Sequence, residues 1–64
     1  SKYRNLLSKI EGADTKDELI ELEKEVNQTV KDKGIKVYHG LVLRNAIEEV
    51  ESKFNTESST NEEE

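Results

Sequence analysis

The chain has 64 residues, of which 39% are charged and 31% hydrophobic, and a formal net charge of −5 at pH 7. This length allows one domain, with a core that is only just large enough to fold alone. Cysteine is absent, which excludes a disulfide framework and makes a cytoplasmic location the expectation. The sequence also lacks an apolar run of roughly 20 residues and a signal-peptide pattern, so we expect no membrane segment.

The negative charge is concentrated at the C-terminus. Residues 55–64 carry four acids and no base, whereas residues 1–54 hold eleven acids and ten bases. The last ten residues also lack aliphatic side chains, so they cannot bury enough apolar surface to order themselves. We therefore expect a folded domain over residues 1–54 and a disordered acidic tail over residues 55–64, which provides solubility or attracts a basic partner.

The first predicted helix covers residues 2–11. Its apolar residues recur at helical spacing and lie on one narrow stripe: Tyr3, Leu6, Leu7 and Ile10. Gly12 ends this pattern, and Asp14 and Thr15 begin a new element.

The second predicted helix covers residues 16–33 and has the clearest start signal in the chain. Thr15 is its N-cap, and Glu18 three residues later completes a capping box. Aliphatic residues then recur at spacings of three and four: Leu19, Leu22, Val26 and Val30. Gly34 is the residue expected to turn left-handed and end the helix.

The third predicted helix covers residues 38–55, and its apolar face holds Leu43, Ala46, Ile47, Val50 and Phe54. Its start is placed between Val37 and Leu41, because Gly40 weakens any helix that runs through it. A short link around Gly34 joins the second and third helices into an antiparallel hairpin. We predict an all-α fold, a small three-helix bundle in which the first helix covers this hairpin.

Some apolar residues do not fit the predicted core. At 100° per residue, Leu41 points nearly opposite to the stripe that starts at Leu43, Val42 lies at its edge, and Ile20 lies about 100° from Leu19. Two alternatives follow: the first helix covers these residues, or the surface stays open for a protein partner or a second copy. The predicted protein interface comprises Tyr3, Ile20, Tyr38, Leu41 and Val42.

The charges alternate in blocks along the chain. Residues 1–10 carry +3, 11–25 carry −5, 26–47 carry +3 and 48–64 carry −6. Solvated helix faces and helix dipoles account for such blocks without further purpose. The functional alternative is a basic and aromatic patch at the hairpin bend, which would contact the phosphate backbone of nucleic acid while a ring stacks on a base. Its residues are Lys31, Lys33, Lys36, Tyr38, His39 and Arg44.

The sequence does not support catalysis. His39 is the only histidine, and no cysteine or nucleophile-and-base arrangement accompanies it. The glycines are too far apart for a phosphate-binding loop, and no metal-ligand spacing is present. We therefore expect a non-enzymatic chain with no cofactor, no metal and no small-molecule substrate.

Methionine is absent from the chain. Either the initiator was removed before Ser1, or the chain is a piece of a longer polypeptide, and both explanations stay open. The layout of a short helix, a charged helical hairpin and a tail resembles the small appended domains of larger proteins, including bacterial and phage recombination proteins and helicases. That resemblance is one of architecture and rests on no signature residues. It implies a nucleic-acid context, in which the chain would be an accessory domain of a nucleic-acid-processing protein. The apolar residues that do not fit the core instead favour a non-enzymatic protein-interaction module or appended domain, which is the function we expect first.

Overall fold

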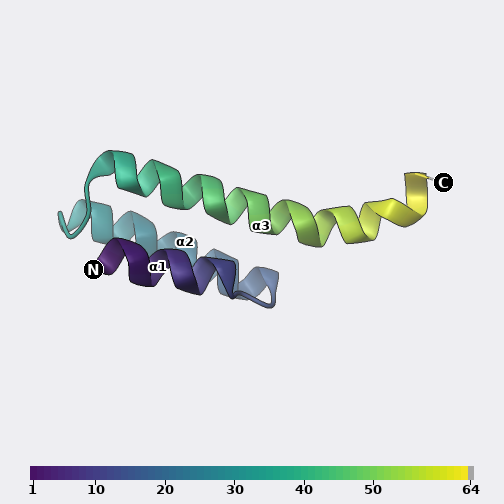
Figure 1. Ribbon diagram of the computed structural model, residues 1–64, viewed down its shortest axis with the longest axis horizontal. Helices are drawn as coiled ribbons and strands as arrows, with labels where there is room; N and C mark the ends of the chain where they lie inside the picture. Colours follow the sequence, from purple (N-terminus) through teal and green to yellow (C-terminus); the bar gives the residue numbers. More distant parts are fainter. Residues whose placement is uncertain (64) are drawn as a thin grey trace.

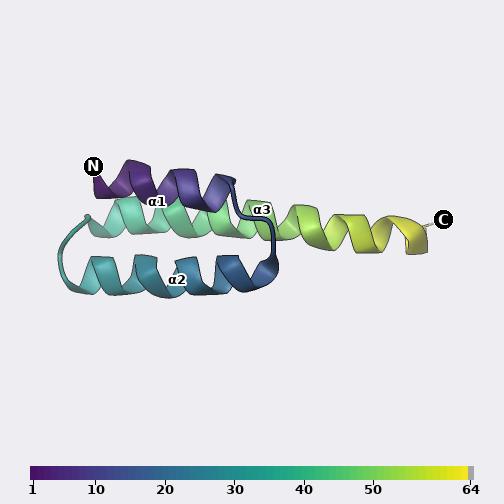
Figure 2. The same ribbon diagram turned by 90° about the horizontal axis from the view of Figure 1, so that it is seen from below.

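The computed structural model describes the backbone of residues 1–63 and the side chains of residues 1–54. It contains three helices, α1 (Lys2–Glu11), α2 (Lys16–Lys31) and α3 (Val37–Glu63), and no strand within the described backbone (Figure 1). The helices run up, down and up, so that α2 is antiparallel to both others (Figure 2). The predicted all-α bundle built on an antiparallel helical hairpin is confirmed.

Hydroxyl side chains cap the N-termini of the first two helices, and the cap of α2 is the predicted Thr15. The Ser1 hydroxyl accepts a hydrogen bond from the Arg4 backbone N–H at 3.4 Å, and the Thr15 hydroxyl accepts one from the Glu18 N–H at 3.2 Å. The Glu18 carboxylate in turn accepts from the Asp14 N–H at 2.7 Å. The chain thus satisfies N–H groups that a helix start leaves without partners, which places α2 where its sequence predicts.

The C-terminus of α2 differs in detail from its prediction, because the helix ends at Lys31 and the left-handed residue is Lys33, with φ 64°. The Lys33 N–H donates to the Val30 carbonyl at 3.0 Å and the Gly34 N–H donates to the Thr29 carbonyl at 2.8 Å. These two bonds form a Schellman motif whose left-handed position holds lysine instead of glycine.

Gly34 has a different role from the predicted one. No described glycine has a positive φ, and a Cβ at Gly34 would lie 2.9 Å from Thr29 Cγ2 and 3.3 Å from Lys2 Cδ. Gly34 therefore allows a close approach of the bend to α1 and α2, and the prediction that it turns left-handed is wrong.

Gly40 lies within the first turns of α3 and does not interrupt the helix. Its N–H donates to the Lys36 carbonyl at 2.9 Å, and a Cβ built on it would lie 2.6 Å from Val30 Cγ2. The missing side chain lets the C-terminal end of α2 pack closely against α3. The low helix propensity of glycine is offset by this contact, which explains a helix that starts as early as Val37.

At its other end α3 continues to Glu63, past Asn55, near which the sequence places its end. This part of α3 extends beyond both other helices (Figures 1 and 2). The side chains of residues 55–64 lie outside the described residues, and the predicted disorder of the tail stays a prediction.

The core is made by residues from all three helices and from the bend. Ile10 of α1, Val26 of α2 and Leu43 of α3 are fully buried at its centre. The other buried apolar residues are Leu6, Leu19, Leu22, Ile35 and Ile47. Ile35 precedes α3 and closes the end of the core beneath the bend.

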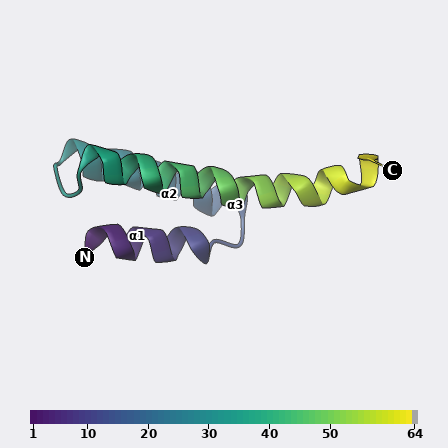
Figure 3. The same ribbon diagram turned by 45° about the horizontal axis from the view of Figure 1, so that its top comes forward.

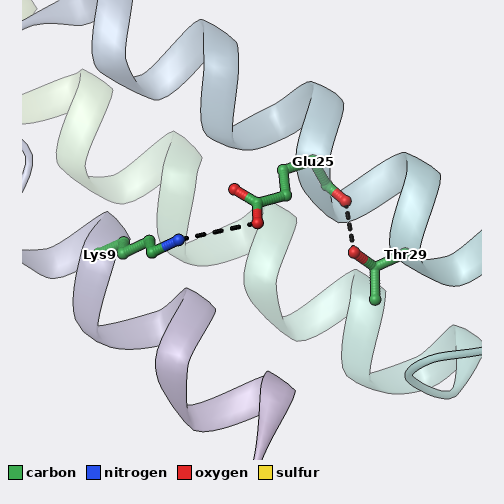
Figure 4. Close-up of polar contacts among 3 residues, drawn as sticks. All are labelled: Lys9, Glu25 and Thr29. Carbon is green, nitrogen blue, oxygen red and sulfur yellow. Dashed lines mark hydrogen bonds and ion pairs between the residues drawn. The ribbon is translucent and has the colours of Figure 1, made fainter.

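Polar side-chain contacts within and between the helices lie at the surface. Lys9 of α1 points toward Glu25 of α2, with 3.7 Å between Nζ and Oε2, and the Thr29 hydroxyl donates to the Glu25 carbonyl at 2.7 Å (Figure 4). On the other side of α2, Arg44 Nη1 donates to Asn27 Oδ1 at 3.1 Å. Exposed contacts of this kind add little stability, so apolar burial holds the bundle together.

Candidate interaction surface

Four large apolar side chains are exposed in the first turns of α3: Val37 is 66% exposed, Tyr38 60%, Leu41 51% and Val42 41%. Their spacing places all four within an arc of about 140° on one side of the helix. We call this group the α3 outer patch. The buried Leu43 and Ile47 lie on the opposite side, toward the other helices. In Figure 3 α3 passes in front of α2 with α1 beside it, and no other element lies on its outer side.

Helix α1 does not cover Ile20 and Leu41, two of the apolar residues that do not fit the predicted core. Ile20 is 50% exposed and Leu41 51% exposed, which excludes the alternative in which the first helix buries both. Instead, α1 packs its apolar stripe into the core through Leu6 and Ile10. An open apolar surface is therefore present, as the second alternative expected.

Ile20 does not belong to the same surface as Leu41. The Gly40–Val30 approach and the Arg44–Asn27 hydrogen bond fix the antiparallel register of α2 and α3. Ile20 precedes Val30 by ten residues, which corresponds to about 15 Å along α2 away from the level of Leu41. Ile20 is thus separated along the bundle from Leu41 and Val42, a separation that depends on the register between the helices.

Tyr3 and Tyr38 are joined through His39. The rings of Tyr3 and His39 are stacked with centroids 4.6 Å apart, and those of Tyr38 and His39 are 4.3 Å apart and tilted. Tyr3 and His39 are half-buried, whereas Tyr38 is exposed. This aromatic row connects α1 to the start of α3 and supports the Tyr38 ring at the edge of the α3 outer patch.

The predicted basic patch is brought together only in part. Lys31, Lys33 and Lys36 are exposed around the bend. Arg44 is half-buried and its guanidinium donates to Asn27, and His39 belongs to the aromatic row. Two of these lysines line an open groove of about 520 Å³, whose lining residues are Val30, Lys33, Gly34, Ile35, Lys36 and Val37. The exposed members of the predicted patch are the three lysines and Tyr38.

The charge blocks of the sequence become two poles in the bundle. Because the helices run up, down and up, the starts of α1 and α3 meet the end of α2, and Lys2, Lys31 and Lys36 gather at one end. The opposite end combines the start of α2, including Asp17, with the later part of α3, which holds Glu51. The α3 outer patch lies at the basic end.

Val37 is the most exposed large apolar side chain of the patch, at 66%, and was not among the predicted interface residues. The sequence placed it in the connection before the helix. Its spacing of four from Leu41 matches the spacing of Tyr38 from Val42, and this repeat was the available signal once the helix is taken to begin at Val37.

The described residues were also compared with the requirements of a membrane span and of a metal site. No described helix is both long and apolar enough to span a bilayer, and no group of three or more His, Cys, Asp or Glu side chains among the described residues is arranged to hold a metal ion. A second open groove, of about 450 Å³, lies between the end of α1 and the start of α2, and its lining includes Lys9, Glu18 and Leu22.

Comparison of the chain with protein-family models, curated proteins and solved structures found no match. Function is therefore inferred from the surface of the bundle.

Proposed function

We propose that this chain is a non-enzymatic, cytoplasmic protein-interaction module, either as an independent small protein or as an appended domain. The α3 outer patch is its docking surface. The observation that carries the proposal is the exposure of four neighbouring apolar side chains on the side of α3 that faces away from the core. Protein interfaces commonly combine a few apolar or aromatic anchors with a charged rim. Tyr38 and Leu41 provide such anchors, and Lys36 lies at the rim.

Folding of the bundle does not require this patch, which strengthens the proposal. The buried core is complete without Val37, Tyr38, Leu41 or Val42. Exposed apolar residues scattered singly are normal in soluble proteins, but a contiguous group rimmed by charge is typical of a binding site.

A photo-cross-linking experiment tests the proposal, with the photo-reactive residue at Leu41 and a matched control at Ile20. The two side chains are exposed to the same extent, 51% and 50%, and lie on different helices. In cells that make the full protein, we expect position 41 to give a defined protein cross-link that position 20 does not. Absence of any protein product at position 41, or the same products at both positions, would contradict the proposal.

A second candidate function is contact with a nucleic-acid backbone at the basic end. It is favoured by the three exposed lysines beside the exposed Tyr38 ring, since lysines neutralise phosphates and a tyrosine ring can stack on a base. Amide-shift NMR with a short single-stranded oligonucleotide tests it. Salt-sensitive shifts confined to residues 31–44 would establish this function, and their absence at low salt would reject it.

A further inference from the structure

The outer side of α3 changes from apolar to acidic along its length. Glu48 follows Leu41 by seven residues and Glu49 follows Val42 by seven, so each glutamate lies within about 20° of the apolar residue it follows. Both glutamates are exposed. The same side of one helix thus presents apolar residues near the bend and two carboxylates two turns further on.

The opposite flank of the α3 outer patch is basic. Lys33 and Lys36 lie in and directly after the bend and are exposed. The first turn of α3 contains no acid, although the positive end of the helix dipole favours one. Within residues 1–54, the ion pairs of the structure involve neither these lysines nor Glu48 and Glu49.

From the bend along α3, lysines come first, the apolar patch follows and glutamates come last. A second copy in the opposite direction would therefore place its glutamates opposite these lysines and its lysines opposite these glutamates. If a second α3 lies antiparallel across the first with its two-fold axis near Leu41 and Val42, the apolar residues of the two copies meet at the centre. Residues 48 and 49 of each copy then lie over the bend of the other, beside Lys33 and Lys36. A parallel arrangement would instead place glutamates against glutamates and lysines against lysines, which is unfavourable.

We propose that the occupant of the α3 outer patch is a second copy of this chain, packed antiparallel through α3. The proposal rests on the interaction function above and names its partner. Each copy supplies two carboxylates to the positive end of the other copy's α3, where its own first turn has none. The groove beside Val37 and Ile35 receives the partner's side chains around Glu48 and Glu49.

The size of the patch sets the expected strength of the dimer. Four side chains and their rim bury less than the roughly 800 Å² per partner of a standard stable interface. The association is therefore expected to be weak and reversible. It should be visible by sedimentation or NMR between about 20 μM and about 2 mM protein and favoured by a high local concentration.

Charge reversal tests the proposed arrangement. One variant carries Glu48→Lys and Glu49→Lys, and the other carries Lys33→Glu and Lys36→Glu. All four positions are exposed, so both variants should keep the fold, which circular dichroism checks. In either variant alone, like charges meet at both ends of the antiparallel pair, and we expect self-association at least about tenfold weaker than that of the natural chain.

Mixing the two variants provides the decisive result. In the antiparallel heterodimer, opposite charges meet at both ends, so we expect an equimolar mixture to recover the association of the natural chain. An outcome in which each variant self-associates as well as the natural chain, or in which the mixture does not associate, would overturn the antiparallel pairing.

Two further substitutions separate this proposal from the proposed function. Leu41→Asp should abolish dimerisation, whereas Ile20→Asp, at an equally exposed position, should leave it unchanged. A natural chain that stays monomeric over the whole concentration range would overturn the second copy as partner. If position 41 still gave a cross-link to a different protein, the interaction function would stand with another occupant.

Discussion

Leu41 and Leu43 are the same residue type, two positions apart in α3, yet Leu41 is 51% exposed and Leu43 0% exposed. Two residues correspond to about 200° of helical rotation, so the two side chains leave α3 in nearly opposite directions. Leu43 meets α1 and α2 in the core, whereas Leu41 joins the α3 outer patch. The difference shows that one helix here serves two purposes, with folding on its inner side and, as we propose, recognition on its outer side.

Truncating each leucine tests this division most strongly. Leu43→Ala should lower the free energy of unfolding by about 2–5 kcal/mol, because it leaves a cavity in a fully packed site. Leu41→Ala should change it by no more than about 0.5 kcal/mol, as for a surface substitution. Urea denaturation of both variants measures the two values. Equal losses would show that the two sides of α3 are not distinct.

A substitution at Gly40 probes how closely the inner side of α3 approaches α2. Gly40→Ala raises helix propensity, but its Cβ would lie 2.6 Å from Val30 Cγ2, and the resulting overpacking should lower stability by about 1–3 kcal/mol. The added change Val30→Ala should relieve the clash, so that the losses in a double-mutant cycle are less than additive. A stabilised Gly40→Ala variant would contradict the close approach.

Val50 is intermediate in burial between Leu43 and Leu41, since it is half-buried and packs at the margin of the core. Val50→Ala should cost roughly 1 kcal/mol, less than Leu43→Ala and more than Leu41→Ala. Thermal unfolding of the three variants gives the order directly. An unchanged unfolding temperature for Val50→Ala would place this residue on the outer side of α3.

A substitution in the bend between α2 and α3 should stabilise the bundle slightly, in contrast to the losses expected above. Lys33 has a φ of 64°, which costs an ordinary side chain about 1 kcal/mol and costs glycine nothing sterically. Lys33→Gly should therefore raise the free energy of unfolding by up to about 1 kcal/mol, and Lys31→Gly, inside α2, should lower it by about the same amount. Destabilisation by Lys33→Gly would contradict the left-handed conformation at this residue.

Removal of the tail should have the smallest effect. Residues 56–64 contribute no aliphatic side chain, so truncation after Asn55 should leave the thermal unfolding midpoint nearly unchanged. Differential scanning calorimetry of the two chains checks this expectation. A fall of many degrees would mean that the tail docks on the bundle.

The parts of the fold that depend on local signals were predictable. Thr15 and Glu18 fixed the start of α2 by their hydrogen-bonding chemistry, and the spacing of Leu6 and Ile10 fixed the buried side of α1. These features depend on residues within a few positions of one another. The sequence alone was therefore sufficient for the class and order of the helices.

The features that were missed depend on contacts between helices. Gly34 was expected to take the left-handed position that Lys33 occupies, and only the approach of Thr29 and Lys2 shows why glycine is needed at position 34. Ile20 and Leu41 looked like one surface because the α2–α3 register is set by Gly40. The location of the α3 outer patch followed from helical angles, but its exposure depended on where α1 packs.

Amide NMR of the labelled natural chain over a dilution series tests the central claim that two copies of the chain dock through the outer side of α3. The account predicts concentration-dependent shifts in residues 37–42, with accompanying shifts at Lys33, Lys36, Glu48 and Glu49, and none around Ile20. Shifts centred on α1 or on the start of α2, or spectra that do not change up to about 2 mM, would contradict self-association through this side of α3.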